Sequence, residues 1–478
     1  MIKSPAFRGK RYAVLGLARS GRATVEALVA SGAEVTAWDE KEEARAALLS
    51  SLSRGDGEGD HAKHGGGAER DDGPSTAFQA VPLPMSSAHR EDLVSFADPL
   101  TIDLAGFDGV VVSPGVPLNR HPIAAKARNA GVPVIGDIEL FALARPSLPP
   151  HKVVGITGTN GKSTTTALVH HILKTAGVPT TMGGNIGLPI LAQDPLPEGG
   201  VYVLELSSYQ IDLTFSLDCD VAVLTNLSPD HLDRYVDESA YYKAKRRLFE
   251  MQTAGHVGIY NNLDHLSWCL FDERDPPHET WAYAGDLDYI RLPDGVASIP
   301  LPSSLAGSHN AANAEQAMMA CRYVGVPQGQ IVAALPSFKE LPHRMERVTD
   351  KGGVLFVNDS KATNPDSTAP ALAAYPHIHW IVGGRAKTED LGPCEAQLGH
   401  VRAAYTIGES GPMFFRLLDG KVPAVTQSGT LDRAVKDAAG AAKAGEVVLL
   451  SPACASFDQF RDYEHRGAAF REAVEALP

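Results

Sequence analysis

The sequence has few cysteines, no long apolar run and no excess of basic residues, and each absence excludes a class of protein. The 5 cysteines among 478 residues are widely spaced and form no C-x-x-C pair. We therefore expect reduced thiols in a cytoplasmic protein, with neither a disulfide framework nor a zinc site. No apolar stretch approaches the ~20 residues of a membrane span, and residues 12–17 are too short for a signal peptide. The net charge of −14 disfavours a nucleic-acid partner, because binding a phosphate backbone relies on a basic surface.

Apolar strands and helical patterns alternate along the chain. With 44% hydrophobic and 21% charged residues, the composition is that of a soluble globular protein, and the length suits about three domains. Strands are predicted at residues 11–16, 34–39, 110–113, 151–157, 201–205, 221–226, 354–358, 378–383, 404–407 and 447–451. The alternation predicts an α/β fold with mostly parallel sheets in three domains, at residues 1–146, 147–341 and 342–478, of which the first and last are Rossmann-like.

Two stretches interrupt this alternation. Residues 54–76 are rich in glycine and charge and nearly free of apolar residues, which predicts a flexible insertion in the first domain. His61 and His64 lie there, but without a surrounding scaffold we do not expect them to bind a metal. The proline-rich residues 145–150 are predicted to link the first two domains.

The strongest functional signal is the string GITGTNGKST at residues 155–164. A buried strand leads into a glycine-rich turn, and Lys162 opens a helix. Such a turn directs backbone N–H groups towards phosphate oxygens, and the helix N-terminus adds positive potential. We expect Lys162 to reach the β- and γ-phosphates of ATP and the Ser163 hydroxyl to hold Mg²⁺, which makes the central domain a P-loop ATPase. A turn without a ligand is the less favoured alternative.

One position departs from the usual phosphate loop. The G-x-x-x-x-G-K-[ST] spacing requires glycine at position 156, where this chain has Ile156. The shorter loop resembles that of the Mur ligases and the related folylpolyglutamate synthases, which activate a carboxylate as an acyl phosphate and then add an amine. The resemblance implies an ATP-dependent amide-bond ligase. It places the following residues around the phosphates: Gly158, Thr159, Asn160, Gly161, Lys162, Ser163 and Thr164.

Two strand ends carry candidate metal ligands. Glu205 ends the predicted strand 201–205, at the carboxyl edge of a sheet where ligands bind. It opens the string ELSSYQ, which resembles the Mur ligase segment whose glutamate binds Mg²⁺. The string NLSPDHLDRY at residues 226–235 places His231 between acidic residues after another strand, where it could orient a metal-bound group. A capped loop leading to a helix is the plainer alternative for that string.

Lys245 stands out on the predicted helix 238–251. Tyr241, Lys245, Leu248 and Phe249 fall at i, i+4, i+7 and i+8, which is one apolar face, whereas Lys243 points elsewhere. A lysine on a buried face snorkels, pairs with a carboxylate or serves chemistry as a neutral amine. The matching lysine of the Mur ligases is carbamylated, so the resemblance implies a CO₂-derived carbamate on Lys245 that binds Mg²⁺. A plain ion pair is the alternative.

Further strings resemble one branch of the Mur ligases, which adds D-glutamate to UDP-N-acetylmuramoyl-L-alanine. They are GGNIGLP (183–189), SHNAANAEQA (308–317), LPHRME (341–346), NDSKATNPDST (358–368), GGRAK (383–387) and SPACASFDQFRDYEHRG (451–467). The D-N-P-R signature of the branch that adds a diamino acid is missing. In the turn G-x-A-x-x-G at residues 16–21, Ala18 replaces the second glycine of a dinucleotide fingerprint, which argues against a nicotinamide dehydrogenase.

The resemblance implies three sets of contacts. Those with the UDP-linked substrate fall on Arg19, Ser20, Asp39, Gly115, Asn185 and Ser207. Those with ATP beyond the phosphate loop fall on Asn310, Asn313, Arg344 and Asp359. Those with D-glutamate fall on Lys361, Thr363, Lys387, Ser456 and Phe457.

The implied chemistry needs ATP and two Mg²⁺ ions. One ion is expected on Ser163 and Glu205, and the other on His231 and the carbamate of Lys245, while Lys162 neutralises charge on the transferred phosphoryl. We expect a monomer that acts on small molecules, with Lys162, His231 and Lys245 as its catalytic residues. A folylpolyglutamate synthase, with another acceptor, remains an alternative. A non-catalytic ATP-binding regulator is the second, although Glu205, His231 and Lys245 are all present.

Overall fold

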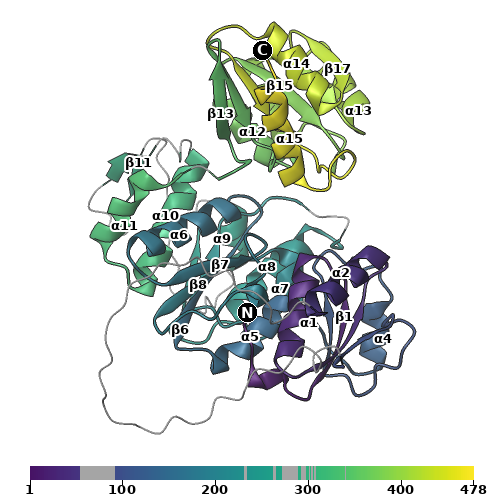
Figure 1. Cartoon of the computed structure of the whole chain (residues 1–478). Coiled ribbons are helices and arrows are strands. Elements are labelled where there is room, and N and C mark those ends of the chain that lie inside the picture. Colours follow the sequence, from purple (N-terminus) through teal and green to yellow (C-terminus); the bar gives the residue numbers. More distant parts are fainter. Residues whose placement is uncertain are drawn as a thin grey trace, which may run out of the picture. The chain divides into compact units, whose positions relative to one another are not determined.

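Three open sheets and a two-stranded ribbon make up the part of the chain that the structure describes (Figure 1). The structure, a computed structural model, describes residues 1–53, 92–230, 234–261, 265–271, 289–291, 298–300, 302, 305, 308–339 and 341–478. The insertion 54–76 and His231 therefore lie outside the described residues. Contacts divide the chain into two compact units: Met1–Gly155, Pro179–Asp220 and His231–His256 form the first, and Ile156–Val178, Val221–Asp230 and Val257–Pro478 the second.

The N-terminal sheet has the strand order β3-β2-β1-β4-β5 with parallel pairings, which is the order of a Rossmann half. After the 3-10 helix η1 (Pro5–Phe7), its elements are β1 (Arg11–Leu15), α1 (Arg19–Ala30), β2 (Glu34–Trp38), α2 (Glu42–Ser53), β3 (Val94–Phe96), β4 (Gly109–Val112), α4 (Ile123–Asn129), β5 (Val134–Ile135) and α5 (Asp137–Ala144). Strand residues Ala13 and Val110 share one apolar cluster with Ile123 and Ala127 of α4, so this helix covers one face.

The central sheet has the order β10-β9-β6-β8-β7, and its described pairings β7–β8 and β9–β10 are parallel. Its elements are β6 (His151–Thr157), α6 (Lys162–Thr175), β7 (Thr180–Gly184), η3 (Ile190–Ala192), β8 (Gly200–Glu205), α7 (Ser208–Asp212), β9 (Val221–Leu224), α8 (Glu238–Glu250), β10 (Val257–Tyr260), α9 (His265–Phe271), β11 (Tyr289–Arg291), β12 (Ser298–Pro300), α10 (Ser308–Val324), α11 (Gln328–Ala334) and η5 (Leu335–Ser337). Helix α6 begins at Lys162, as predicted. None of the described helices has the length and apolar character needed to span a membrane.

The C-terminal sheet has the order β13-β14-β18-β15-β16-β17 and is parallel except at β13. Its elements are β13 (Glu346–Lys351), β14 (Val354–Asn358), α12 (Pro365–Ala373), β15 (Ile378–Gly383), η6 (Gly392–His400), β16 (Val401–Ile407), α13 (Gly411–Leu418), β17 (Val425–Gly429), α14 (Leu431–Ala441), β18 (Val447–Leu450) and α15 (Tyr463–Glu475). Alternate residues of β18 join two apolar clusters, one with α12 and α13 and one with α14 and α15. Helices therefore cover both faces (Figure 1), and the predicted α/β class with mostly parallel sheets is confirmed.

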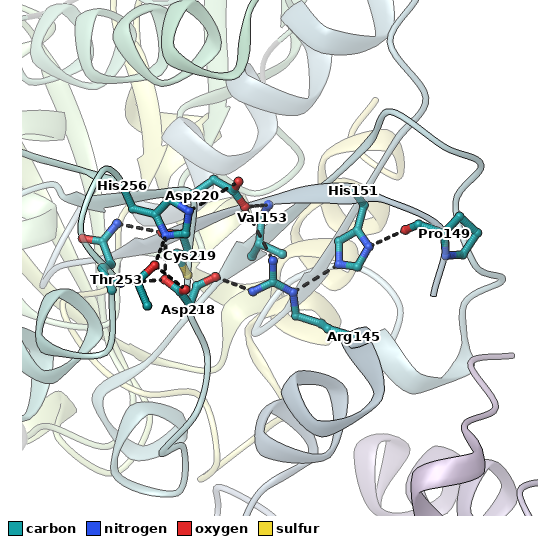
Figure 2. Close-up of polar contacts among 10 residues, drawn as sticks. Arg145, Pro149, His151, Val153, Asp218, Cys219, Asp220, Thr253 and His256 are labelled. Carbon is teal, nitrogen blue, oxygen red and sulfur yellow. Dashed lines mark hydrogen bonds and ion pairs between the residues drawn. The ribbon is translucent and has the colours of Figure 1, made fainter. Parts of the chain in front are cut away.

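Residues 145–150, predicted as a linker, are anchored at Arg145 by polar contacts (Figure 2). The 3-10 helix η2 (Arg145–Ser147) has a proline in its first turn, where the fixed φ of proline is tolerated. Arg145 donates from Nε to His151 Nε2 at 3.1 Å and lies 3.5 Å from Asp220 Oδ2. It also donates to the Asp218 carbonyl, and the Asp218 carboxylate lies 2.6 Å from His256 Nδ1. Proline content alone did not reveal this anchoring because the partners come from distant segments.

Candidate active site

The phosphate loop is fastened to the segment that follows β9. Thr225 N donates to Thr157 O at 2.9 Å, and Thr159 N donates to Asn226 O at 2.9 Å. The Asn226 side chain binds Asn160 twice, accepting from its N–H and donating to its carbonyl, each at 3.0 Å. These bonds fix the shape of the loop. Neither Thr225 nor Asn226 was predicted as a site residue, although the string that begins at Asn226 holds the predicted residue His231.

Helix α6 begins directly at the end of this loop. Its N-cap is Gly161, in the left-handed conformation with φ 84°, and the N-terminus of a helix is the end that binds phosphates. Lys162 Nζ donates to the carbonyls of Gly158 and Thr159 at 2.9 and 2.7 Å. The Ser163 hydroxyl accepts from Arg344 Nη2 at 2.8 Å, which places predicted residues 158–164 and Arg344 together in the second unit.

One face of α10 lies against this loop. Asn310, Asn313 and Gln316 repeat at i, i+3 and i+6, and Asn313 Nδ2 donates to Asn310 Oδ1 at 3.4 Å. Thr165 Oγ1 on α6 donates to Asn313 Oδ1 at 3.4 Å, and Gln316 Nε2 donates to Leu224 O at 3.1 Å. The structure therefore brings the predicted pair of asparagines to the start of α6.

A strained turn presents Arg344. The residues on either side, His343 and Met345, have φ of 63° and 46°, a left-handed conformation that non-glycine residues adopt only when their surroundings enforce it. The enforcing bonds come from the predicted site itself. Met345 N donates to Asp359 Oδ1 at 3.2 Å, and Lys361 N donates to His343 O at 3.0 Å. Three predicted residues, Arg344, Asp359 and Lys361, therefore meet at one turn.

The Asp359 carboxylate is buried, with 6% of the residue exposed. Burial raises its pKa to about 7, although hydrogen bonds from Ser451 Oγ and Met345 N favour the ionised form. A buried carboxyl group with a pKa shifted this far, at a predicted ATP contact, is typical of functional sites.

In the first unit, Glu205 ends β8, as predicted, and is 1% exposed. Asn185 Nδ2 donates to Glu205 Oε1 at 2.9 Å, and Asn185 N donates to Glu205 O at 2.8 Å. The predicted metal ligand and a predicted substrate contact therefore lie together. Ser207 and Gln210 of the same string form a capping box at the start of α7, which gives both residues a structural role.

Lys245 lies on the buried face of α8, as the helical pattern predicted. It is 1% exposed, and its Nζ lies 4.5 Å from the ring centroid of Tyr241. Nearby Asp212 accepts from Tyr235 Oη at 2.7 Å, and burial raises its pKa. Within the described ranges, no group of three or more His, Cys, Asp or Glu has the arrangement of a metal site.

The predicted UDP-substrate residues of the N-terminal sheet surround its first turn. The Asp39 carboxylate accepts from Leu17 N at 2.7 Å, which ties the end of β2 to that turn. Arg19 and Ser20 open α1, and Arg19 Nη2 donates to Gly187 O at 3.1 Å. The turn is thereby fixed by a carboxylate in the place where the fingerprint puts an acid.

Gly115 is held by an arginine that the sequence analysis did not name. Arg234 donates from Nη1 to Gly115 O at 3.3 Å and from Nη2 to Pro114 O and Val116 O at 3.3 and 2.9 Å. Its guanidinium lies 4.3 Å from the ring centroid of Tyr209. Arg234 belongs to the string NLSPDHLDRY, but its partners lie far away in the chain, so the string alone gave no signal.

The predicted D-glutamate residues follow three neighbouring parallel strands. Lys361 and Thr363 follow β14, Ser456 and Phe457 follow β18, and Lys387 follows β15, while the sheet order is β14-β18-β15. The carboxyl ends of parallel strands share one edge of a sheet. The structure therefore brings these three loops to a common edge.

Side chains at this edge differ in their contacts. Lys387 Nζ lies 3.1 Å from Asp230 Oδ1 within the second unit. Lys361 Nζ lies 3.9 Å from the ring centroid of Tyr463, a residue that the sequence analysis did not name although it lies in the string 451–467. Ser456 is buried, whereas Phe457 is 64% exposed.

Comparisons with known proteins agree with this geometry. The family model of the Mur ligase middle domain matches residues 156–321, and that of the Mur ligase glutamate ligase domain matches residues 343–454. The UDP-N-acetylmuramoylalanine–D-glutamate ligase of Novosphingobium aromaticivorans is 56% identical over 477 residues, which cover 100% of this chain and 97% of the relative. The enzyme of the same name from Sphingopyxis alaskensis is 54% identical over 482 residues and covers 100% of both.

A solved structure shows the same fold. The crystal structure of UDP-N-acetylmuramate-alanine ligase MurC from Thermotoga maritima has a TM-score of 0.58 and 17% identity, and covers 98% of this chain and 99% of that chain. Two models of one family therefore match the chain that carries this phosphate loop and these C-terminal loops. The chain also has full-length relatives with more than 50% sequence identity. The chain belongs to the Mur ligase family.

Proposed function

We propose that this chain joins D-glutamate to UDP-N-acetylmuramoyl-L-alanine, with ATP converted to ADP and phosphate, as a step of peptidoglycan precursor synthesis. The observation that carries the proposal is the preformed phosphate loop at the start of α6, with Arg344 on Ser163. The names of the full-length relatives supply the acceptor and the amino acid. The remaining support is that the loops carrying the predicted D-glutamate residues follow neighbouring parallel strands of the C-terminal sheet.

The proposed reaction has two steps. The alanyl carboxylate of the UDP-linked substrate attacks the γ-phosphorus of ATP and releases ADP, and the amine of D-glutamate then displaces phosphate from the acyl phosphate. Lys162, whose Nζ lies at the loop carbonyls of Gly158 and Thr159, binds the β- and γ-phosphates of ATP. Lys361 and Lys387 bind the carboxylates of D-glutamate. Water must be kept out, because it would hydrolyse the acyl phosphate.

The Mur ligases use ATP and Mg²⁺, and the residues of this chain suit that ion. The Ser163 hydroxyl and the Glu205 carboxylate are hard oxygen donors, 3% and 1% exposed. We propose that they hold one Mg²⁺, and that His231 with a carbamate on Lys245 holds a second. When bound, the ions neutralise negative charge on the transferred phosphoryl.

The test is ATP-dependent phosphate release by the whole chain with UDP-N-acetylmuramoyl-L-alanine and D-glutamate. We expect release that requires D-glutamate and is absent with L-glutamate or with a folate acceptor. Lys162→Met should abolish it, whereas the control Lys174→Met, an exposed lysine at the other end of α6, should not. Release with folate instead would favour a folylpolyglutamate synthase, and no release that depends on D-glutamate would refute the proposal.

A further inference from the structure

Arg466 is a buried cation held by neutral oxygens. It lies in the first turn of α15 and is 1% exposed. Its Nε donates to Ser360 Oγ at 3.0 Å, and its Nη2 donates to Ser360 O and Cys454 O at 2.8 and 3.0 Å. Its described partners include no carboxylate, and Nη1 is buried without a hydrogen-bond partner among the described residues. Among the described residues no carboxylate lies within ion-pair distance of the guanidinium, although the charges of Asp458 and Asp359 are near enough to favour its protonated form.

Two of the three D-glutamate loops are joined by this guanidinium. Ser360 directly precedes Lys361 in the loop after β14, and Cys454 precedes Ser456 in the loop after β18. Hydrogen bonds from a charged donor to backbone carbonyls are short and strong. One planar group that binds both carbonyls therefore fixes the position of one loop relative to the other.

The third loop lies against the same guanidinium. Gly384, after β15, has a φ of 136°, and a Cβ there would overlap Ala455 O and lie 3.2 Å from Arg466 Nη1. Arg385 and Ala455 exchange backbone hydrogen bonds of 2.9 and 3.0 Å, which ties the loop of Lys387 to that of Ser456. Glycine is required at position 384 because the two loops and the guanidinium approach so closely.

The charge itself has a consequence for ligand binding. Burial lowers the pKa of Arg466 to about 10, so the side chain is still protonated at neutral pH. Asp458 and Asp359 offset the burial of this cation only in part, so the buried charge destabilises the fold, and a neutral side chain of similar size would avoid that loss. Behind the loops that we propose bind an amino acid with two carboxylates, the same charge favours binding.

We propose that Arg466 is a positioning residue for the amino-acid substrate: it holds the loops of Lys361, Ser456 and Lys387 in one arrangement and keeps a positive charge behind them. The inference rests on the proposed function, which supplies the dianionic substrate. Arg466 itself is too buried to contact that substrate directly.

Steady-state kinetics of the full chain test the proposal. Arg466→Met removes the charge and the fork of donors, so KM for D-glutamate should rise at least about tenfold, while KM for the UDP-linked substrate changes less than about twofold. Arg466→Lys keeps the charge but not the fork, and should give an intermediate KM. The control is Lys351→Met, because Lys351 Nζ donates to Leu477 O beyond the far end of α15 at 2.6 Å. This variant should leave both KM values unchanged.

Hydrogen exchange gives a readout independent of activity. Arg466→Lys should speed amide exchange in all three loops, at residues 359–363, 384–387 and 453–457, whereas Lys351→Met should not. Unchanged exchange in the three loops, an unchanged KM for D-glutamate, or an equal rise in both KM values would each overturn the proposal. If Arg466→Met does not fold, Arg466→Lys and Ser360→Ala decide by the same two measurements. A wild-type chain without D-glutamate-dependent phosphate release would refute the proposed function instead, and the exchange result would still judge the positioning role.

Discussion

Two glycines at the ends of α6 allow the geometry of the phosphate loop to be tested. Gly161 precedes the helix with φ 84°, and Gly177 follows it with φ 76°. Alanine at either position costs about 1–2 kcal/mol because L-residues avoid the left-handed region. At Gly177 nothing lies within 4 Å of the new Cβ, whereas at Gly161 it would overlap Asn313 Oδ1. Gly177→Ala is therefore the control for backbone strain alone.

The clash adds to the strain at Gly161. Asn313 is 4% exposed, and its 3.4 Å hydrogen bonds to Thr165 and Asn310 would be lost if it retreated. At about 1 kcal/mol for each bond, we expect Gly161→Ala to lose about 3–4 kcal/mol in total, against about 1–2 kcal/mol for Gly177→Ala. Because Asn313 and the loop N–H groups both shift, the affinity for ADP should fall at least about tenfold, which is about 1.4 kcal/mol.

Calorimetric titration with Mg-ADP and thermal unfolding with and without the nucleotide measure both quantities. The control should bind ADP as the wild type does and unfold only slightly earlier. Normal ADP affinity in Gly161→Ala would show that the loop tolerates a Cβ and would refute the reasoning. Equal losses of affinity in the two variants would show that strain alone, rather than the contact with Asn313, decides binding.

Three further substitutions have defined outcomes. Lys245→Met should abolish phosphate release, whereas the control Lys243→Met should not. Native mass spectrometry in CO₂-equilibrated buffer should show added mass on the wild type that Lys245→Met lacks. Full activity of Lys245→Met would contradict the carbamate. Burial alone would raise the pKa of Asp218, but hydrogen bonds from Thr253 and the contact with His256 lower it, so the ionised group stabilises the fold above its unfolded pKa and this contribution is lost on acidification. Asp218→Asn should therefore lower the unfolding temperature at pH 7, and its difference from the wild type should shrink as the pH falls below the unfolded-state pKa. Burial raises the pKa of Asp137 to about 6, so the wild type loses stability as pH rises from about 4 to 6. Asp137→Asn should therefore unfold at a higher temperature than the wild type at pH 8 but not at pH 4. An unchanged unfolding temperature at pH 8 would contradict this.

The features that the sequence predicted correctly are local ones. The start of α6 at Lys162 depends on a short string in which the strand, the turn and the helix follow directly. The buried stripe of α8 is likewise determined by helical periodicity, so Lys245 could be placed on it without any knowledge of its neighbours. Strand ends such as Glu205 were found because a buried apolar run stops there.

The features that the sequence did not predict depend on pairing between distant segments. Asn226 braces the phosphate loop from the end of β9, and Arg234 holds the turn at Gly115 from 119 positions away. Each of these side chains is polar and unremarkable in its own string. Only the sheet order and the packing of the loops decide which backbone groups they reach.

The loops predicted to bind D-glutamate show this dependence most clearly. Strand β18 comes late in the sequence but lies between β14 and β15 in the sheet. The order of the strands along the chain therefore does not predict that Cys454 lies beside Ser360 and Gly384. Resemblance to the Mur ligases named Lys361, Lys387 and Ser456, because those residues belong to strings that the family shares. The resemblance did not point to Arg466, although this residue lies in the same string as Ser456. The role of a buried guanidinium becomes clear only when its partners are known, and here they are neutral oxygens. A cation kept inside a fold without a hydrogen-bonded carboxylate is costly, and the loops that it joins give the reason for its presence.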